Sequence, residues 1–447
     1  MIRTATLVFV VLVASCAGVT ALFGSAVEAQ AESEPTERWN RTYGGSGDDI
    51  FADIARTEDG GYVLAGETER SGTGIDGWVV KIGPDGEPEW ERTLSGPGTD
   101  RLYSVVATDD GYVVAGRTDR DGRARGWVVE LGPDGATRNE RTPGVGAFYG
   151  VERAGEGYVL AGWTRGDSGV AGWLLKFDGS GSRAWERTYA APDGYSAGRL
   201  KAVVPASNGY FLAGEVEGES QDAWALRVGD GGERRWQRTR GGAAREAIWA
   251  ATGGDDGIVL AGESESGDSR DGWALRYDAN GKLAWEERYG GERDDWLDSA
   301  MRTEDGGYLF TGGTLTGGIG SADGYVVKTG PDGRVGRETT LGSTSWDKPW
   351  PAIRAHDGGY LLAGQTGGFG AAGMDGWVLH LGSDGQGSDS ARTTEEGDGA
   401  TGSGATKGER TDGTTPDGKS SLPGFTGPLA LVALALSVLL WRARSKE

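Results

Sequence analysis

The clearest pattern in the chain is a recurring pair of short apolar runs, each bordered by turn residues. In the first copy the runs begin at Tyr62 (YVLAGET) and at Trp78 (WVVKI), and the second run leads into a Gly-Pro-Asp-Gly turn. Both runs are almost continuously apolar, which is typical of strands that are covered on both faces. Asp-Gly pairs tolerate the backbone angles of tight hairpins. The pattern predicts antiparallel hairpins buried on both sides.

This pair of runs returns along the chain with a period of about fifty residues. The first run begins at Tyr62, Tyr112, Tyr158, Tyr210, Ile258, Tyr308 and Tyr360. The second begins at Trp78, Trp127, Trp173, Trp224, Trp273, Tyr325 and Trp377. Self-similarity at such a period indicates one repeat architecture rather than independent domains.

Each unit contains four predicted strands. In the first unit they span residues 50–57, 62–68, 77–82 and 87–93, with a longer loop between the second and the third. Small sheets that are apolar on both faces are covered when they pack face to face around an axis. The sequence therefore predicts an all-β fold over residues 32–386: a seven-bladed β-propeller with four antiparallel strands per blade.

The two ends of the repeat array complement each other. A fourth-strand sequence around Trp39 precedes the first complete unit, whereas the last unit ends with a third strand that begins at Trp377. We expect the N-terminal strand to pair with the strand from Trp377 to Leu381, because this would close the ring and remove an exposed sheet edge. The repeated tryptophans are expected to fill the space between blades.

Candidate binding residues lie in the loops of one predicted rim, which vary in sequence while the turns of the other rim are short and uniform. The start of each innermost strand is predicted to contribute an aromatic and acidic mouth, formed by Tyr103, Tyr149, Trp249, Trp296 and Trp350 with Asp49, Asp100, Asp295 and Asp347. Aromatic rings with carboxylates suit sugars, and carboxylates alone suit divalent cations. Packing and solvation are the other interpretation of the same residues.

A further aspartate precedes the third strand in five units, at Asp76, Asp222, Asp271, Asp323 and Asp375. These side chains have two interpretations, calcium binding or hydrogen bonds that stabilise a turn. Calcium is the one cofactor left open. No catalytic set is predicted, because only two histidines, His356 and His380, and one cysteine, Cys16, occur in the chain. The net charge of −22 argues against binding to nucleic acid.

Both ends of the chain are predicted to be sorting segments. Residues 1–31 have an early arginine, an apolar run and a small-x-small ending, as in a secretory signal peptide. An alternative is a lipobox that ends at Cys16. Residues 387–421 contain almost nothing apolar and are expected to form a flexible stalk. Residues 425–441 form an uncharged apolar stretch followed by arginines, which predicts a transmembrane helix.

Pro423, Gly424 and Phe425, followed by an apolar stretch and a basic tail, resemble the PGF-CTERM sorting signal of archaeal surface proteins. The resemblance covers residues 422–447 and implies processing by an archaeosortase and transfer to a membrane lipid. A halophilic archaeal host would also account for the acidic composition. The unit with WVVKIGPDGEPEW resembles the PQQ-type propeller repeat, which implies the fold only. Asn40 begins the one sequon and is a candidate for N-glycosylation.

These observations predict a protein anchored at its C-terminus on the outer face of the cell membrane or in the cell wall. The expected role is a non-catalytic binding or structural module of the envelope, with a glycan, a cation or a protein as ligand. The alternative is a secreted hydrolase, namely a carboxylate-based glycosidase, because two carboxylates are sufficient for that reaction.

Overall fold

The computed structural model describes residues 37–382, except 71–73, 97, 121, 167–168, 319 and 370–372. The predicted signal peptide, the stalk and the sorting signal with Pro423, Gly424 and Phe425 lie outside the described residues. Within the described part, no helix is long and apolar enough to cross a membrane.

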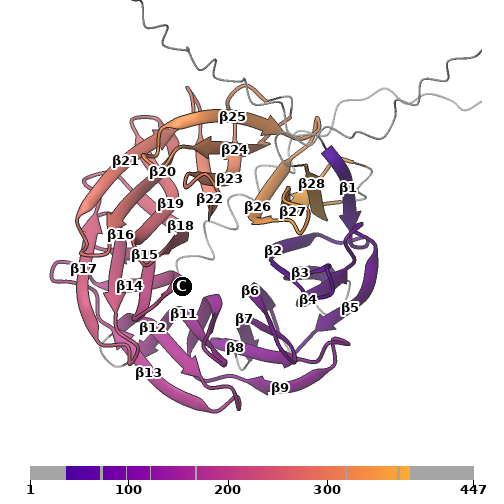
Figure 1. Ribbon diagram of the computed structural model, residues 1–447, viewed down its shortest axis with the longest axis horizontal. Helices are drawn as coiled ribbons and strands as arrows, with labels where there is room; N and C mark the ends of the chain where they lie inside the picture. The colour runs from indigo at the N-terminus through magenta and orange to yellow at the C-terminus, as the bar shows by residue number, and fades with distance from the viewer. Residues whose placement is uncertain are drawn as a thin grey trace, which may run out of the picture. The chain divides into compact units, whose positions relative to one another are not determined.

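The described chain forms twenty-eight strands arranged as a ring of seven four-stranded antiparallel blades (Figure 1). In each blade, strand a lies innermost and strand d outermost. Blade 1 contains β2 (Asp49–Arg56), β3 (Tyr62–Arg70), β4 (Gly74–Ile82) and β5 (Pro88–Leu94). Blade 2 contains β6 (Asp100–Thr108), β7 (Gly111–Arg120), β8 (Arg123–Leu131) and β9 (Thr137–Arg141). Blade 3 contains β10 (Gly146–Ala154), β11 (Gly157–Gly166), β12 (Gly169–Phe177) and β13 (Arg183–Tyr189).

Blades 4 to 7 follow the same order. Blade 4 contains β14 (Ala197–Ala206), β15 (Gly209–Glu217), β16 (Gln221–Val228) and β17 (Arg234–Arg240). Blade 5 contains β18 (Glu246–Gly254), β19 (Gly257–Ser266), β20 (Ser269–Asp278) and β21 (Leu283–Tyr289). Blade 6 contains β22 (Asp295–Arg302), β23 (Tyr308–Thr314), β24 (Asp323–Thr329) and β25 (Val335–Leu341). Blade 7 contains β26 (Asp347–Arg354), β27 (Tyr360–Thr366), β28 (Asp375–Leu381) and, as strand d, β1 (Glu37–Tyr43).

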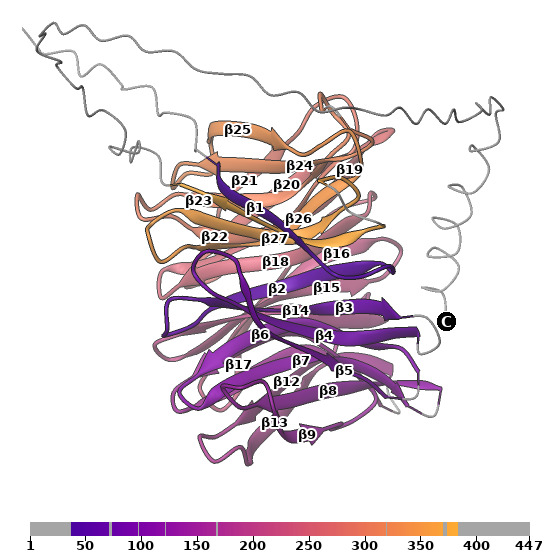
Figure 2. The ribbon, with the colours of Figure 1, turned by 90° about the vertical axis from the view of Figure 1, so that its right-hand side faces the viewer.

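The ring closes as predicted, through the pairing of β1 with β28. The two strands run antiparallel from the pair Glu37 and Leu381 to the pair Tyr43 and Gly376. Figure 1 shows the indigo β1 beside the yellow end of the last blade, and Figure 2 shows the same ring from the side. The predicted all-β, seven-bladed propeller closed by its N-terminal strand is confirmed.

The hairpin between strands b and c of blade 1 is longer than the sequence predicted. In blade 1 the pairing of β3 with β4 continues to Glu69 opposite Ile75 and Arg70 opposite Gly74. The predicted long loop is therefore mostly strand. The sequence did not predict these strand ends because their side chains are polar, and the prediction was based on apolar runs.

The core lies between blades rather than within one of them. Trp78 is 1% exposed and stacks on Phe51 at 4.5 Å between ring centroids. The cluster around it combines residues of blade 1 with Leu361, Ala363 and Val378 of blade 7. The predicted interblade position of the strand-c tryptophan is confirmed.

A second set of contacts fixes each outer strand to the turn between strands c and d of the next blade. The Nε1–H of Trp90 donates a hydrogen bond to the carbonyl oxygen of Pro133 (3.1 Å). The hydroxyl of Tyr43 donates a hydrogen bond to the carbonyl oxygen of Gly86 (2.7 Å). Gly135 has a φ of +75°, and a Cβ there would lie 2.8 Å from the ring of Trp90. The repeated turn and the repeated tryptophan therefore form one interblade joint.

Candidate functional site at the mouth of the ring

A β-bulge interrupts every innermost strand at the same place. The pairing of strands a and b skips a residue in each of the seven blades. The skipped residues are Ala52, Tyr103, Tyr149, Lys201, Trp249, Asp298 and, in blade 7, Trp350 with Pro351. Bulges redirect side chains and often lie next to binding sites. The fold thus gives one set of side chains a common position around the inside of the ring.

One half of this set joins blades 2 to 5. The rings of Tyr103 and Tyr149 lie 5.1 Å apart. The Nζ of Lys201 lies 4.3 Å from the ring centroid of Tyr149 and 4.9 Å from that of Trp249. Lys201 contacts the innermost strands of both neighbouring blades at once, so its ammonium group lies on the inner side of the ring. Two cation–π contacts stabilise the charge there.

The other half repeats this arrangement in blades 6 and 7. The Nζ of Lys348 lies 4.7 Å from the ring centroid of Trp350 and 5.3 Å from that of Trp296. It also forms an ion pair with Asp298 at 3.1 Å. Trp346 continues the series outward, because it is 38% exposed and its ring lies 6.5 Å from that of Trp296.

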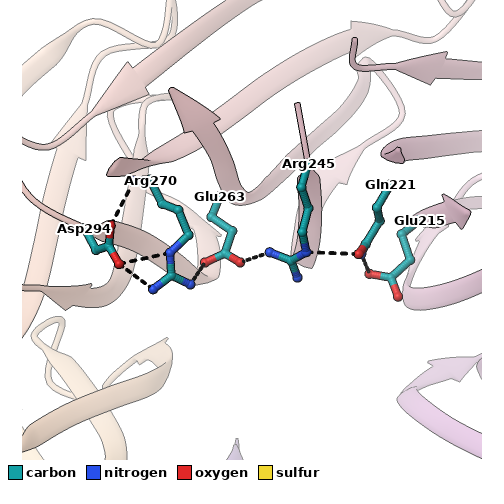
Figure 3. Close-up of polar contacts among 6 residues, drawn as sticks. All are labelled: Glu215, Gln221, Arg245, Glu263, Arg270 and Asp294. Carbon is teal, nitrogen blue, oxygen red and sulfur yellow. Dashed lines mark hydrogen bonds and ion pairs between the residues drawn. The ribbon is translucent and has the colours of Figure 1, made fainter. Parts of the chain in front are cut away.

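A chain of polar contacts crosses the same rim from blade 4 to blade 6 (Figure 3). Arg245 joins Gln221 (3.2 Å) to Glu263 (2.5 Å), and Arg270 joins Glu263 (3.1 Å) to Asp294 (2.8 Å). The pair Gln221 and Glu215 (2.6 Å) links this chain to Lys201, which lies 3.5 Å from Glu215. Glu263 is buried between the two arginines, so the arc has a fixed geometry.

The mouth contains several ion-paired cations although the whole protein has a net charge of −22. Five cations form ion pairs with five carboxylates there: Arg101, Lys201, Arg245, Arg270 and Lys348 with Glu67, Glu215, Glu263, Asp294 and Asp298. This concentration of basic groups allows polar ligands of either sign to approach, unlike the rest of the acidic surface.

Two acids with raised pKa values lie on the inner strands of blades 1 and 3. Loss of hydration raises the pKa of Asp53 to about 6, although the hydroxyl of Ser104 (2.7 Å) and the amide N–H of Val105 (2.9 Å) donate hydrogen bonds to it. Loss of hydration, together with the charge of Asp53, raises the pKa of Glu152 to about 7. Ser104 also accepts a hydrogen bond from the amide N–H of Val151 (3.1 Å), so it connects the two segments.

The structure places the predicted mouth residues in different environments. Tyr103, Tyr149, Trp249 and Trp350 are bulge residues, and Trp296 lies two positions before the bulge residue of its blade. The predicted carboxylates Asp49, Asp100, Asp295 and Asp347 are buried at 0–1% exposure and accept hydrogen bonds from amide N–H groups of the loop before strand a. The aromatic residues are therefore brought together, and the aspartates lie beneath the loops. Ligand binding by any of them stays a prediction.

Two hollows occur on the same rim. One, of about 390 Å³, is lined at the ring closure by residues that include Ser46, Asp49, Thr68 and Trp78. The other, of about 290 Å³, lies between blades 5 and 6 and is lined by residues that include Asp268 and Glu292. Both are formed by the loops that the sequence marked as variable.

Asn40, the candidate glycosylation site, lies on the outer strand β1. It is half-buried, and its Oδ1 accepts a hydrogen bond from the indole N–H of Trp377 at 2.7 Å. Glu140, Glu186 and Glu286 accept the same bond in blades 2, 3 and 5. Asn40 therefore has a structural role, and its glycosylation stays a prediction.

Sequence reasoning did not identify Lys201, Lys348, Asp298 and Trp346 as members of the mouth. The first three occupy or adjoin the bulge, which leaves no local mark in the sequence. An alignment of the seven units on the bulge would have revealed their shared position. Trp346 precedes the strand and was counted only as part of a variable loop.

No protein-family model matches this chain, and no curated protein matches its sequence. Its structure is similar to the β-propeller domain of the Trilobed protease from Pyrococcus furiosus (12% identity, 76% of this chain and 94% of that chain, TM-score 0.42). It is also similar to the polysaccharide lyase Uly1 (10% identity, 79% and 94%, TM-score 0.49) and to Kuenenia stuttgartiensis hydrazine synthase (11% identity, 76% and 96%, TM-score 0.49). At these identities the likeness concerns the fold alone.

Proposed function

We propose that this β-propeller is a non-catalytic binding module of the cell envelope and that the mouth of its ring binds a glycan. The observation that carries the proposal is the pair of lysines, Lys201 and Lys348, each held between two aromatic rings at the bulge. Sugars have apolar faces that stack on aromatic rings and hydroxyl groups that bond to charged side chains. The mouth offers both kinds of surface within one fixed arc.

The exposed ring of Trp346 is the proposed entry to this site. It continues the aromatic series from Trp296 and Lys348 toward solvent. A chain of sugar rings would lie along this series, with its hydroxyl groups bonded to Arg270 and Lys348. The predicted secretion signal and lipid anchor would hold the module on the outer face of the membrane, where envelope glycans occur. Predicted partners are therefore the archaeosortase, the membrane lipid and an envelope glycan or glycoprotein.

A glycan array followed by isothermal titration tests the proposal. The full-length chain is purified in a detergent without a sugar headgroup and compared with Trp346→Ala and Lys348→Met. Each substitution is expected to weaken binding about tenfold or more, because residues at the centre of an interface dominate affinity. The control is Lys282→Met, which removes an exposed lysine from a turn on the opposite rim. The proposal is wrong if no envelope glycan binds, or if all three variants bind like the wild type.

The alternative proposal is a carboxylate-based glycosidase, and the raised pKa values of Asp53 and Glu152 are the observation that favours it. A group with a pKa near 7 can act as a general acid. Against this role, Asp53 already accepts hydrogen bonds from Ser104, Val105 and Ile54. Release of reducing sugar from envelope glycans, abolished by both Asp53→Asn and Glu152→Gln, would favour the enzyme over the binding module.

A further inference from the structure

Pairs of buried carboxylates lie beneath the loops that connect neighbouring blades. At four junctions, an aspartate at the start of strand c is followed twenty-four residues later by an aspartate or glutamate at the start of strand a of the next blade. A fifth pair forms across the ring closure. The pairs are Asp76 with Asp100, Asp222 with Glu246, Asp271 with Asp295, Asp323 with Asp347, and Asp375 with Asp49. Nine of these ten residues are at most 9% exposed, and Asp271 is the exception.

At two of the five junctions, the two members of the pair converge on one point. A Cβ added to Gly342, in the loop between blades 6 and 7, would lie 2.8 Å from Oδ1 of Asp323 and 3.0 Å from Oδ2 of Asp347. A Cβ on Gly241, in the loop between blades 4 and 5, would lie 2.4 Å from Oδ1 of Asp222 and 2.7 Å from Oε2 of Glu246. Each loop glycine therefore leaves room where carboxylate oxygens of two blades meet.

Three of the described junction carboxylates are buried without an ion-pair partner. Among the described residues, Asp100, Asp323 and Asp347 form no ion pair with lysine or arginine, although each is at most 2% exposed. Buried charges in proteins are normally paired with an opposite charge or coordinate a metal ion. These acids therefore require a positive charge that the chain does not supply.

An unpartnered oxygen gives independent support at the junction of blades 5 and 6. Oδ1 of Asp295 is buried and has no hydrogen-bond partner, whereas its Oδ2 accepts the amide N–H of Gly291 at 2.8 Å. At the ring closure, the hollow of about 390 Å³ is lined by Asp49 together with Ser46, Thr68 and Arg70.

We propose that these five junctions bind divalent cations and that calcium is the ion they suit best. In the described part of the chain, no three Asp, Glu, His or Cys side chains gather at one point. Each site would therefore combine two carboxylates with loop carbonyl oxygens, hydroxyl groups and water. Calcium accepts six to eight such oxygen ligands in flexible geometry, whereas zinc prefers nitrogen and sulfur. Each ion would join strand c of one blade to strand a of the next.

The two remaining junctions provide an internal contrast. Between blades 2 and 3 the corresponding positions are Arg125 and Gly146, and between blades 3 and 4 they are Ala171 and Gly198. Neither junction has a carboxylate at these positions, so neither should bind a cation. The proposal thus predicts five ions per chain rather than seven.

Ion content and thermal melting of the full-length protein test the proposal directly. Protein stripped with EDTA is titrated with calcium chloride up to about 1 mM, within the affinity range of extracellular calcium modules. We expect saturable binding and a rise in the melting temperature. Terbium can replace calcium, and its luminescence is expected to be sensitised by Trp296 and Trp346, which adjoin Asp295 and Asp347 in the sequence.

Asp347→Asn is expected to remove one of the five bound ions and to lower the terbium luminescence. Asp100→Asn is a second test at another junction, for the case in which Asp347→Asn does not fold. Asp332→Asn, an exposed turn aspartate on the opposite rim, is the control and should retain every ion. The proposal is overturned if the wild type binds no calcium, or if Asp347→Asn and Asp100→Asn bind as many ions as the control. It is also overturned if these two variants melt above the wild type in saturating calcium, because this would mean that an uncompensated charge had been relieved.

Discussion

At the scale of single residues, the indole N–H groups of the strand-c tryptophans distinguish blades that otherwise look alike. Trp173 donates to Glu186 at 2.8 Å, whereas Nε1 of Trp78 is buried and has no partner. The residue in blade 1 that corresponds to Glu186 is Glu91, which forms an ion pair with Arg70 at 3.1 Å instead. One sequence position therefore has two hydrogen-bonding states in the same molecule.

Replacing each of these tryptophans by phenylalanine separates the hydrogen bond from the packing. Trp78→Phe and Trp173→Phe remove the same volume, and both rings stack on a phenylalanine. Only the second variant loses a hydrogen bond, so we expect Trp173→Phe to cost about 1 kcal/mol more free energy of unfolding. Urea denaturation measures the difference. Equal losses of unfolding free energy in the two variants would mean that the indole N–H of Trp78 also has a hydrogen-bond partner.

The raised pKa of Glu152 makes a prediction about pH. The carboxyl group has a pKa of about 7 in the folded protein, compared with an ordinary value of about 4.5 for a glutamate. The folded state therefore binds this proton more tightly, so the contribution to stability is complete below pH 4.5 and is lost as the pH rises through 7. Glu152→Gln mimics the protonated carboxyl group. Its free energy of unfolding should therefore increase relative to that of the wild type as the pH rises through this interval.

The measurement is the difference in free energy of unfolding between Glu152→Gln and the wild type as a function of pH. Glu156→Gln is a suitable control, because Glu156 is exposed like Glu152 but lies in the turn that follows its strand. A difference curve that stays flat for Glu152→Gln would contradict the assignment.

Residue-scale properties were the least accessible from the sequence. Tyr103 and Trp249 could be named as inner aromatic residues because they follow the start of an apolar strand. Lys201 and Asp298 occupy the same bulge, but their polarity gave no reason to place them beside the aromatic rings. A bulge depends on the partner strand, and a single run of residues does not specify it.

At the scale of elements, β1 differs from every other strand d because no short turn joins it to its strand c, β28, which lies at the other end of the chain. Thr42 lies opposite Trp377 in blade 7, as Thr93 lies opposite Trp78 in blade 1. The two threonines therefore form a matched pair of sites with different connectivity.

Thr42→Pro and Thr93→Pro should have different consequences. Proline has no backbone N–H and fixes φ at about −65°, so both substitutions are expected to weaken the pairing of strand d with strand c. Only Thr42→Pro is also expected to open the ring, because no turn of the chain joins β1 to β28. We expect that variant to unfold at lower urea concentration and to become sensitive to protease near its N-terminus. Identical stability and protease resistance in the two variants would contradict the role of β1 as the closing strand.

Elements were the level at which the sequence was most informative. The repeat starting at Tyr62 and Trp78 predicted the strands, and the unmatched segments at Trp39 and Trp377 predicted their closure. The extension of β3 and β4 into the predicted loop was missed because hydrogen bonding, not burial, holds Arg70 opposite Gly74. Apolar patterns indicate burial, so they do not predict strand ends that lie in solvent.

At the scale of the whole molecule, the distribution of charge connects stability with function. The chain has a net charge of −22, and five ion-paired cations are concentrated at the mouth. Repulsion among acidic side chains elsewhere opposes the compact ring, and salt screens this repulsion. The Debye length falls from about 10 Å at 0.1 M to about 3 Å at 1 M salt.

We therefore expect the melting temperature of the full-length protein to rise as sodium chloride increases over this range. EDTA must be present throughout, because calcium traces would otherwise occupy the interblade carboxylates and conceal the effect of screening. Ion pairs such as Lys348 with Asp298 are too short, at 3.1 Å, and too buried to be screened strongly, so the geometry of the mouth should persist at high salt. Circular dichroism follows the melting. A fall in melting temperature with salt would show that attraction between surface charges, rather than their repulsion, governs the stability of the ring.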